Sequence, residues 1–144
     1  MNEDNKYCNI NKKQNKLYKP FGLNFITSFC FLFTAIDAHL RNKTDLFIGC
    51  SLCLITSLLN HSTYNKYFII LDKLICQFCF LYFIIKCFKM NLYYFMSLIA
   101  AIILLIVYKV LNLCHGKNDI IIHSSLHIIG NIGISFMIEG LVHN

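Results

Sequence analysis

Long apolar stretches separated by short polar linkers make up most of this chain. An α-helix needs about 20 mainly apolar residues to cross a bilayer, and stretches of that order recur after Pro20. They cover approximately residues 21–38, 46–60, 67–88, 92–111 and 120–138. The pattern predicts an all-α fold, a multi-span transmembrane helical bundle of about five helices.

The polar linkers between the stretches are too short to form a separate domain. We therefore expect a single transmembrane bundle domain over residues 21–144, preceded by a basic polar tail over residues 1–20. This tail has no apolar segment of the kind that a signal peptide requires, so we do not expect one.

The composition supports a membrane protein. Hydrophobic residues make up 57% of the 144 residues and charged residues 14%, whereas soluble domains carry about 25% charged residues. The net charge of +6 raises nucleic-acid binding as an alternative. The cations, however, lie in the tail and at the ends of the apolar stretches, where membrane topology accounts for them. We expect an integral, multi-pass membrane protein that contacts membrane lipid and no nucleic acid.

The distribution of Lys and Arg predicts the orientation, because cytoplasmic segments of membrane proteins carry an excess of these residues. With five spans, nine of the 13 Lys and Arg residues lie on the side of the N-terminal tail. The other four, Arg41, Lys43, Lys86 and Lys89, lie on the opposite side. We therefore expect a cytoplasmic N-terminus and a C-terminus on the far side.

Two Cys-x-x-Cys pairs, Cys50 with Cys53 and Cys76 with Cys79, resemble the pattern of a zinc ribbon. Both pairs lie inside apolar stretches, where a cysteine normally acts as a small buried hydrophobic residue. A thiolate would also have to form in a medium that disfavours charge. We expect these thiols to serve packing.

Five polar residues inside or beside the apolar stretches stand out, namely Ser57, His61, Asp72, His123 and His127. Such side chains are costly in a bilayer and commonly mark a functional site. In the five-span topology, the second helix ends where the third and the fifth begin. All five residues are then expected at the same, cytoplasmic, end of the bundle.

The three histidines have the spacing of metal ligands. His123 and His127 are four residues apart and share one face of a helix, and His61 would supply a third imidazole. Three histidines can hold Zn²⁺ and leave one position for a water, whose pKa the ion lowers towards neutrality. Asp72 could orient that water as a general base, and Ser57 could donate a hydrogen bond to a developing oxyanion.

Each of these residues also has a simpler explanation. The two histidines of the last span could form hydrogen bonds to neighbouring helices, and Ser57 could serve helix packing. His61 could be a loop residue at the level of the lipid headgroups. Asp72 could pair with Lys73 or Lys66 nearby. The functional interpretation depends on whether all of them converge.

The pattern Ser-Leu-Leu-Asn-His (residues 57–61), Asp72 in the next helix and His-Ser-Ser-Leu-His (residues 123–127) in the last helix resembles the CREST superfamily. This group includes alkaline ceramidases, hemolysin III-like proteins, and the progestin and adipoQ receptors. The resemblance implies a membrane-embedded helical bundle in which His61, His123 and His127 bind zinc, with Ser57 and Asp72 assisting. Family members typically have seven helices, whereas five are expected here.

The resemblance implies a zinc-dependent hydrolase that acts on a lipid amide or ester, as a ceramidase does. The alternative is a non-enzymatic multi-pass protein that scaffolds or remodels a membrane and uses its polar residues for helix packing. A homo-oligomer is compatible with both functions.

Overall fold

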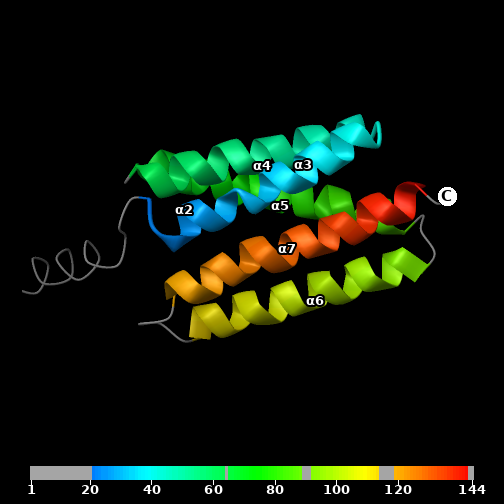
Figure 1. Cartoon of the computed structure of the whole chain (residues 1–144). Helices are drawn as coiled ribbons and strands as arrows, with labels where there is room; N and C mark the ends of the chain where they lie inside the picture. The colour runs from blue at the N-terminus through cyan, green and yellow to red at the C-terminus, as the bar shows by residue number, and fades with distance from the viewer. Residues whose placement is uncertain (1–20, 64, 89–91, 114–118, 143–144) are drawn as a thin grey trace, which may run out of the picture.

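The computed structural model describes residues 21–63, 65–88, 92–113 and 119–142, and over these ranges the chain is helical apart from short turns. The tail over residues 1–20 lies outside the described residues, and so does the segment 114–118. The helices are α2 Leu23–Ser28, α3 Cys30–Leu40, α4 Thr44–Ser62, α5 Lys66–Cys87, α6 Leu92–Leu113 and α7 Asp119–Val142 (Figure 1).

The helices confirm the predicted all-α, multi-span bundle. Four segments, Leu23–Leu40 (α2 with α3), α4, α5 and α7, are each long and apolar enough to cross a membrane. α6 contributes a shorter apolar stretch, Phe95–Tyr108, within its 22 residues. Together they match the five expected stretches, with ends that differ by at most four residues. The cytoplasmic location of the N-terminus stays a prediction.

The first span is broken at Phe29, which separates α2 from α3. The hydroxyl groups of Thr27 and Ser28 both donate to the backbone carbonyl of Asn24, at 3.2 and 2.8 Å. Such bonds compete with the backbone hydrogen bonds of the helix and often bend it. The break therefore has a local cause in two successive hydroxyl residues.

A tight turn joins the first span to α4. Asn42 has a left-handed backbone conformation (φ 56°), which asparagine tolerates better than most residues. The Lys43 N–H donates to the carbonyl of Ala38 at 2.8 Å, and the Asn42 N–H donates to that of His39 at 3.0 Å. This pairing satisfies the free carbonyls at the end of α3. It also lets α4 return alongside α3.

The first and the last span lie side by side and run in the same direction, as Figure 1 shows for α2 and α3 beside α7. Polar side chains join them at four levels. The pairs are Asn24 with Ser124 at 2.6 Å, Thr27 with His127 at 3.1 Å, Thr34 with Asn131 at 2.6 Å, and Arg41 with Glu139 at 2.7 Å. We call these four pairs the polar ladder.

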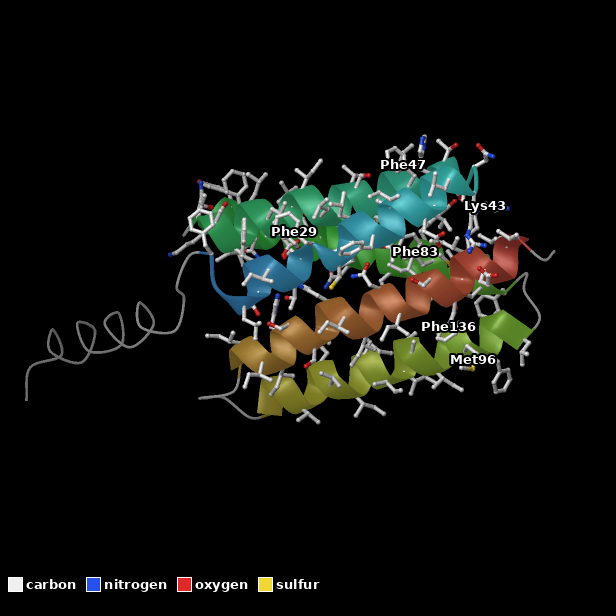
Figure 2. The ribbon with its side chains drawn as sticks, in the orientation of Figure 1. Phe29, Lys43, Phe47, Phe83, Met96 and Phe136 are labelled. Atoms are coloured by element: carbon white, nitrogen blue, oxygen red, sulfur yellow. The ribbon has the colours of Figure 1, made fainter. Side chains whose placement is uncertain are left out.

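α7 continues to Val142, four residues beyond the predicted end. Glu139 forms an ion pair with Arg41, and the Lys43 ammonium donates to the backbone carbonyl of Leu141 at 2.7 Å. Cations near the last carbonyl groups of a helix stabilise that end. Figure 2 shows Lys43 at this end of the bundle. The extension depends on residues about 100 positions away, so the local pattern does not reveal it.

α6 packs mainly against α7, and the two backbones approach closely at Gly133. A Cβ added to Gly133 would lie 3.1 Å from the Cβ of Ala100, and the Ser97 hydroxyl donates to the Gly133 carbonyl at 3.1 Å. Small residues permit such close approach between membrane helices. Met137 and Ile138 of α7 also belong to the apolar core, together with Leu46, Cys50 and Phe83. Phe83 is labelled in Figure 2.

The close approach predicts that Gly133→Val destabilises the bundle by about 1–3 kcal/mol, because the added side chain overpacks the contact with Ala100. The measurement is thermal unfolding of the purified protein in detergent. Ile132→Val is the matched control, since the neighbouring Ile132 is 48% exposed on the outer surface. Equal unfolding temperatures for the two variants would contradict this packing.

Candidate metal centre

The structure brings the three predicted histidines together. One ligand nitrogen from each of His61, His123 and His127 can be chosen so that all lie within 4.8 Å of one another. The ring centroids are 4.9 to 5.5 Å apart. His61 lies in the last turn of α4, and His123 and His127 lie one turn apart near the start of α7. The cluster therefore sits at the predicted end of the bundle and can hold a metal ion.

A contact with Thr27 positions the ring of His127. The Thr27 hydroxyl lies 3.1 Å from Nδ1 of His127 and 3.2 Å from the Asn24 carbonyl, to which it can donate. In the tautomer that carries the proton on Nδ1, the ring donates to this hydroxyl and the Nε2 lone pair is available for a metal ion. Histidine ligands in metal sites usually donate their second N–H in this way.

His61 presents a buried nitrogen to the cluster. Its side chain is 7% exposed, and within the described residues its Nε2 has no hydrogen-bond partner. Burying such a group without a partner costs about 1–3 kcal/mol. The carbonyl group of His61 accepts a hydrogen bond from the Phe21 N–H at 3.2 Å, which ties the end of α4 to the start of the first span. The arrangement of His61 is understandable if its Nε2 binds an ion.

Asp72 is 4% exposed and is held by neutral donors. Its Oδ1 accepts from the hydroxyl groups of Ser57 and Thr56, at 2.8 and 3.1 Å, and its Oδ2 accepts from the Asn60 amide at 2.7 Å. The Cys76 thiol lies 3.6 Å from Oδ1. A carboxylate buried at membrane depth and held by uncharged groups is costly, and such residues commonly have a function.

A cavity of about 370 Å³ connects Asp72 with His123 and His127, all of which contribute to its wall. On α5 its lining residues extend from Asp72 to Cys87, a distance of ~22 Å along a helix. The exposed side chains of Lys73 and Tyr108 also line it, so the cavity reaches the surface of the bundle near the histidines. Most of the remaining wall is apolar.

The five predicted residues thus fall into two linked groups. The histidines form one group, and Ser57 with Asp72 forms the other. Ser57 is fully buried, and its hydroxyl donates to Asp72. We expected this hydroxyl to donate to a developing oxyanion, but in this conformation its proton is used by Asp72. The catalytic roles of Ser57 and Asp72 stay predictions.

Sequence reasoning missed the residues that orient the site, Thr27, Thr56 and Asn60. Thr56 and Asn60 are four residues apart on the face of α4 that meets Asp72, a spacing that the sequence does display. Thr27 had no such signal, because its partner lies 100 positions away. A lone threonine in an apolar helix is usually a packing residue.

The cysteines of the two Cys-x-x-Cys pairs lie between α4 and α5 as free thiols. Cys50 and Cys53 are buried, and the Cys79 thiol donates to the Gly49 carbonyl at 3.6 Å. These positions agree with the expected packing role.

Comparison with models of protein families, with curated proteins and with solved structures gave no match. The interpretation of the site therefore depends on the chemistry of the residues themselves.

The hydrogen bond between Thr27 and His127 predicts that Thr27→Val lowers the affinity for Zn²⁺ by about 10- to 100-fold, because it removes the group that orients a ligand. The measurement is a competition titration of the purified protein with a chelator. Ser28→Ala is the matched control: Ser28 is also buried in α2, but its hydroxyl donates only to Asn24 in the described residues. Equal affinities for the two variants would refute the role of Thr27.

Proposed function

We propose that the protein is an integral-membrane, zinc-dependent hydrolase of CREST-like type that acts on a lipid amide or ester. The convergence of His61, His123 and His127 is the observation that carries this proposal. Its chemistry matches Zn²⁺, which favours neutral imidazole ligands and leaves a position open in catalytic sites.

The residues present fit a zinc ion in three respects. The Thr27 hydroxyl lies 3.1 Å from Nδ1 of His127 and can accept its proton, which would leave Nε2 as the ligand atom. His61 offers a buried nitrogen that lacks a hydrogen-bond partner among the described residues. The i, i+4 spacing of His123 and His127 presents two rings on one face of α7. When bound, the ion supplies Lewis acidity and lowers the pKa of a water.

Asp72 is the best candidate for a general base. It contributes to the wall of the same cavity as His123 and His127, and it approaches from α5, a different helix. The donors on α4, Ser57, Thr56 and Asn60, fix the orientation of its carboxylate. A carboxylate held in this way can accept a proton from a water in the cavity without moving.

The shape of the cavity supports a lipid substrate. The wall is mainly apolar over the ~22 Å from Asp72 to Cys87, while Asp72, Lys73 and the two histidines of α7 lie at one end of it. A substrate with an acyl chain would place the chain along the apolar part and its amide or ester group beside the histidines. The opening near Lys73 and Tyr108 would admit it from the bilayer.

The alternative is a non-enzymatic membrane protein whose polar residues hold its helices together. The hydrogen bonds that join Ser57 to Asp72 and Thr27 to His127 favour it, because both cross between helices. Packing does not account for the buried Nε2 of His61, which receives no hydrogen bond from the described residues. A metal site accounts for the interhelical hydrogen bonds, which orient its residues, and for the buried Nε2 of His61, which would bind the ion.

Zinc content tests the proposal directly. We expect about one zinc ion per chain in detergent-purified protein, measured by elemental analysis, and its loss in His61→Ala and in His127→Ala, since three protein ligands are needed. His39→Ala is the matched control, because His39 is exposed near the end of α3, away from the cluster. No zinc above background in the wild-type protein would refute the proposal.

Hydrolysis requires a second measurement. We expect turnover of a fluorescent long-chain amide or ester in detergent micelles. Asp72→Asn should lower kcat by about 100-fold or more, because the asparagine side chain cannot accept a proton from the attacking water. The zinc content of this variant should stay unchanged. Full zinc occupancy with no turnover of any amide or ester by the wild-type protein would favour the non-enzymatic alternative.

A further inference from the structure

The cavity beside the histidines contains a lysine that neither the metal site nor the general base uses. Lys73 follows Asp72 on α5, and its exposed side chain lines the cavity. It lies seven residues after the start of the span Lys66–Cys87, ~10 Å along the helix, and therefore inside a membrane-spanning segment. Ionisable residues in such segments are rare and commonly mark a substrate pathway.

Lys73 belongs to the face of α5 that borders the cavity. The lining residues Lys73, Gln77, Phe80, Ile84 and Cys87 are spaced by four, three, four and three positions, so they form one stripe along the helix. The stripe is polar at its first two positions and apolar from Phe80 onwards. A lipid in the cavity would place its chain along the apolar part and its headgroup beside Lys73.

The ammonium group of Lys73 has no ion-pair or hydrogen-bond partner among the described residues. Asp72 does not neutralise it by direct contact, because adjacent helix residues do not face each other and the Asp72 oxygens accept from donors on α4. The other acidic side chains that the structure describes form ion pairs at the opposite end of the bundle, namely Asp37, Asp45 and Glu139. Charges away from bulk water are normally paired, so a ligand with an anionic group suits this position.

The charges in the cavity wall favour a ligand with a single negative charge. Asp72 and Lys73 are the only acidic and basic residues in the described lining apart from the two histidines, and their formal charges cancel. An ion bound by three neutral histidines would add positive charge at this end. One ammonium group matches a carboxylate better than a phosphate monoester, which carries about 1.5 to 2 negative charges at pH 7.

We propose that the substrate is an acylated amino acid, a lipid amide whose headgroup ends in a carboxylate, and that Lys73 binds this carboxylate. This inference rests on the hydrolase proposed above and names the substrate class of that site. Hydrolysis breaks the amide C–N bond, joins the water oxygen to the carbonyl carbon and transfers a water proton to the departing nitrogen. The products are a fatty acid and a free amino acid. Lys73 determines specificity and takes no part in the bond changes.

Two amides that differ only in the charged group test the assignment, N-palmitoylglycine with a carboxylate and N-palmitoylethanolamine with a hydroxymethyl group. In neutral detergent micelles we expect a kcat/KM about tenfold or more higher for the glycine amide. Lys73→Gln should lower that value by about 10- to 100-fold, mainly through KM, because a hydrogen bond to a charged group is lost. Its kcat/KM for the ethanolamine amide should stay nearly unchanged.

Lys66→Gln is the matched control, because Lys66 is an exposed lysine on the same helix that does not line the cavity. It should retain the wild-type preference, and so should Lys73→Arg, which keeps the charge. Equal kcat/KM values for the two amides in the wild-type protein would overturn the inference and leave the hydrolase proposal intact.

Binding decides the inference even if neither amide is hydrolysed, a result that would count against the hydrolase. Ketone analogues in which CH₂ replaces the amide NH resist hydrolysis and can displace a fluorescent acyl probe from the cavity. We expect the carboxylate analogue to displace the probe at about tenfold lower concentration than the hydroxymethyl analogue in the wild-type protein, and at similar concentrations in Lys73→Gln. Equal displacement in the wild-type protein, or tighter binding of a phosphate analogue, would overturn the carboxylate assignment.

Discussion

Polar groups inside a bilayer have no water to bond to, and the polar ladder between the first and last spans is the response of this chain to that constraint. Each interhelical hydrogen bond in a membrane contributes only about 0.6 kcal/mol on average. The value of the ladder lies in register, because its four levels fix the first span against α7 along its whole length. Once that register is fixed, Thr27 and His127 lie at the same depth. The ladder thus determines the level at which the last span brings its histidines to His61.

The sequence predicts the fold class, because bilayer thickness leaves few solutions for a chain of apolar stretches. It also predicts which polar residues gather at one end, because successive spans run in opposite directions, so the end of the second span and the starts of the third and fifth lie at the same membrane face. His61, His123 and His127 satisfy this expectation. The contacts that refine the site were not predictable, because Thr27 and His127 lie 100 positions apart. The same limit applies to the end of α7, which depends on Arg41 and Lys43.

Packing and chemistry are not exclusive explanations for the polar residues. Ser57, Thr56 and Asn60 join α4 to α5 and at the same time orient the carboxylate of Asp72. Thr27 joins α2 to α7 and at the same time orients His127. In a bundle this small, a residue that orients a functional group also holds two helices together. Substitutions at these positions therefore change stability and function together unless they preserve shape.

The distance along the chain between the halves of the ladder affects how the protein is made. Its cross-helix contacts join residues 97 to 100 positions apart, so none can form until the last helix has left the ribosome and entered the bilayer. Closing so long a loop is slow compared with forming local contacts. Asp72 can bind its partners on α4 as soon as α5 is in place. His61 meets His123 and His127 only when the last helix joins the bundle, so a chain that lacks α7 can form the polar contacts of Asp72 but not the histidine cluster.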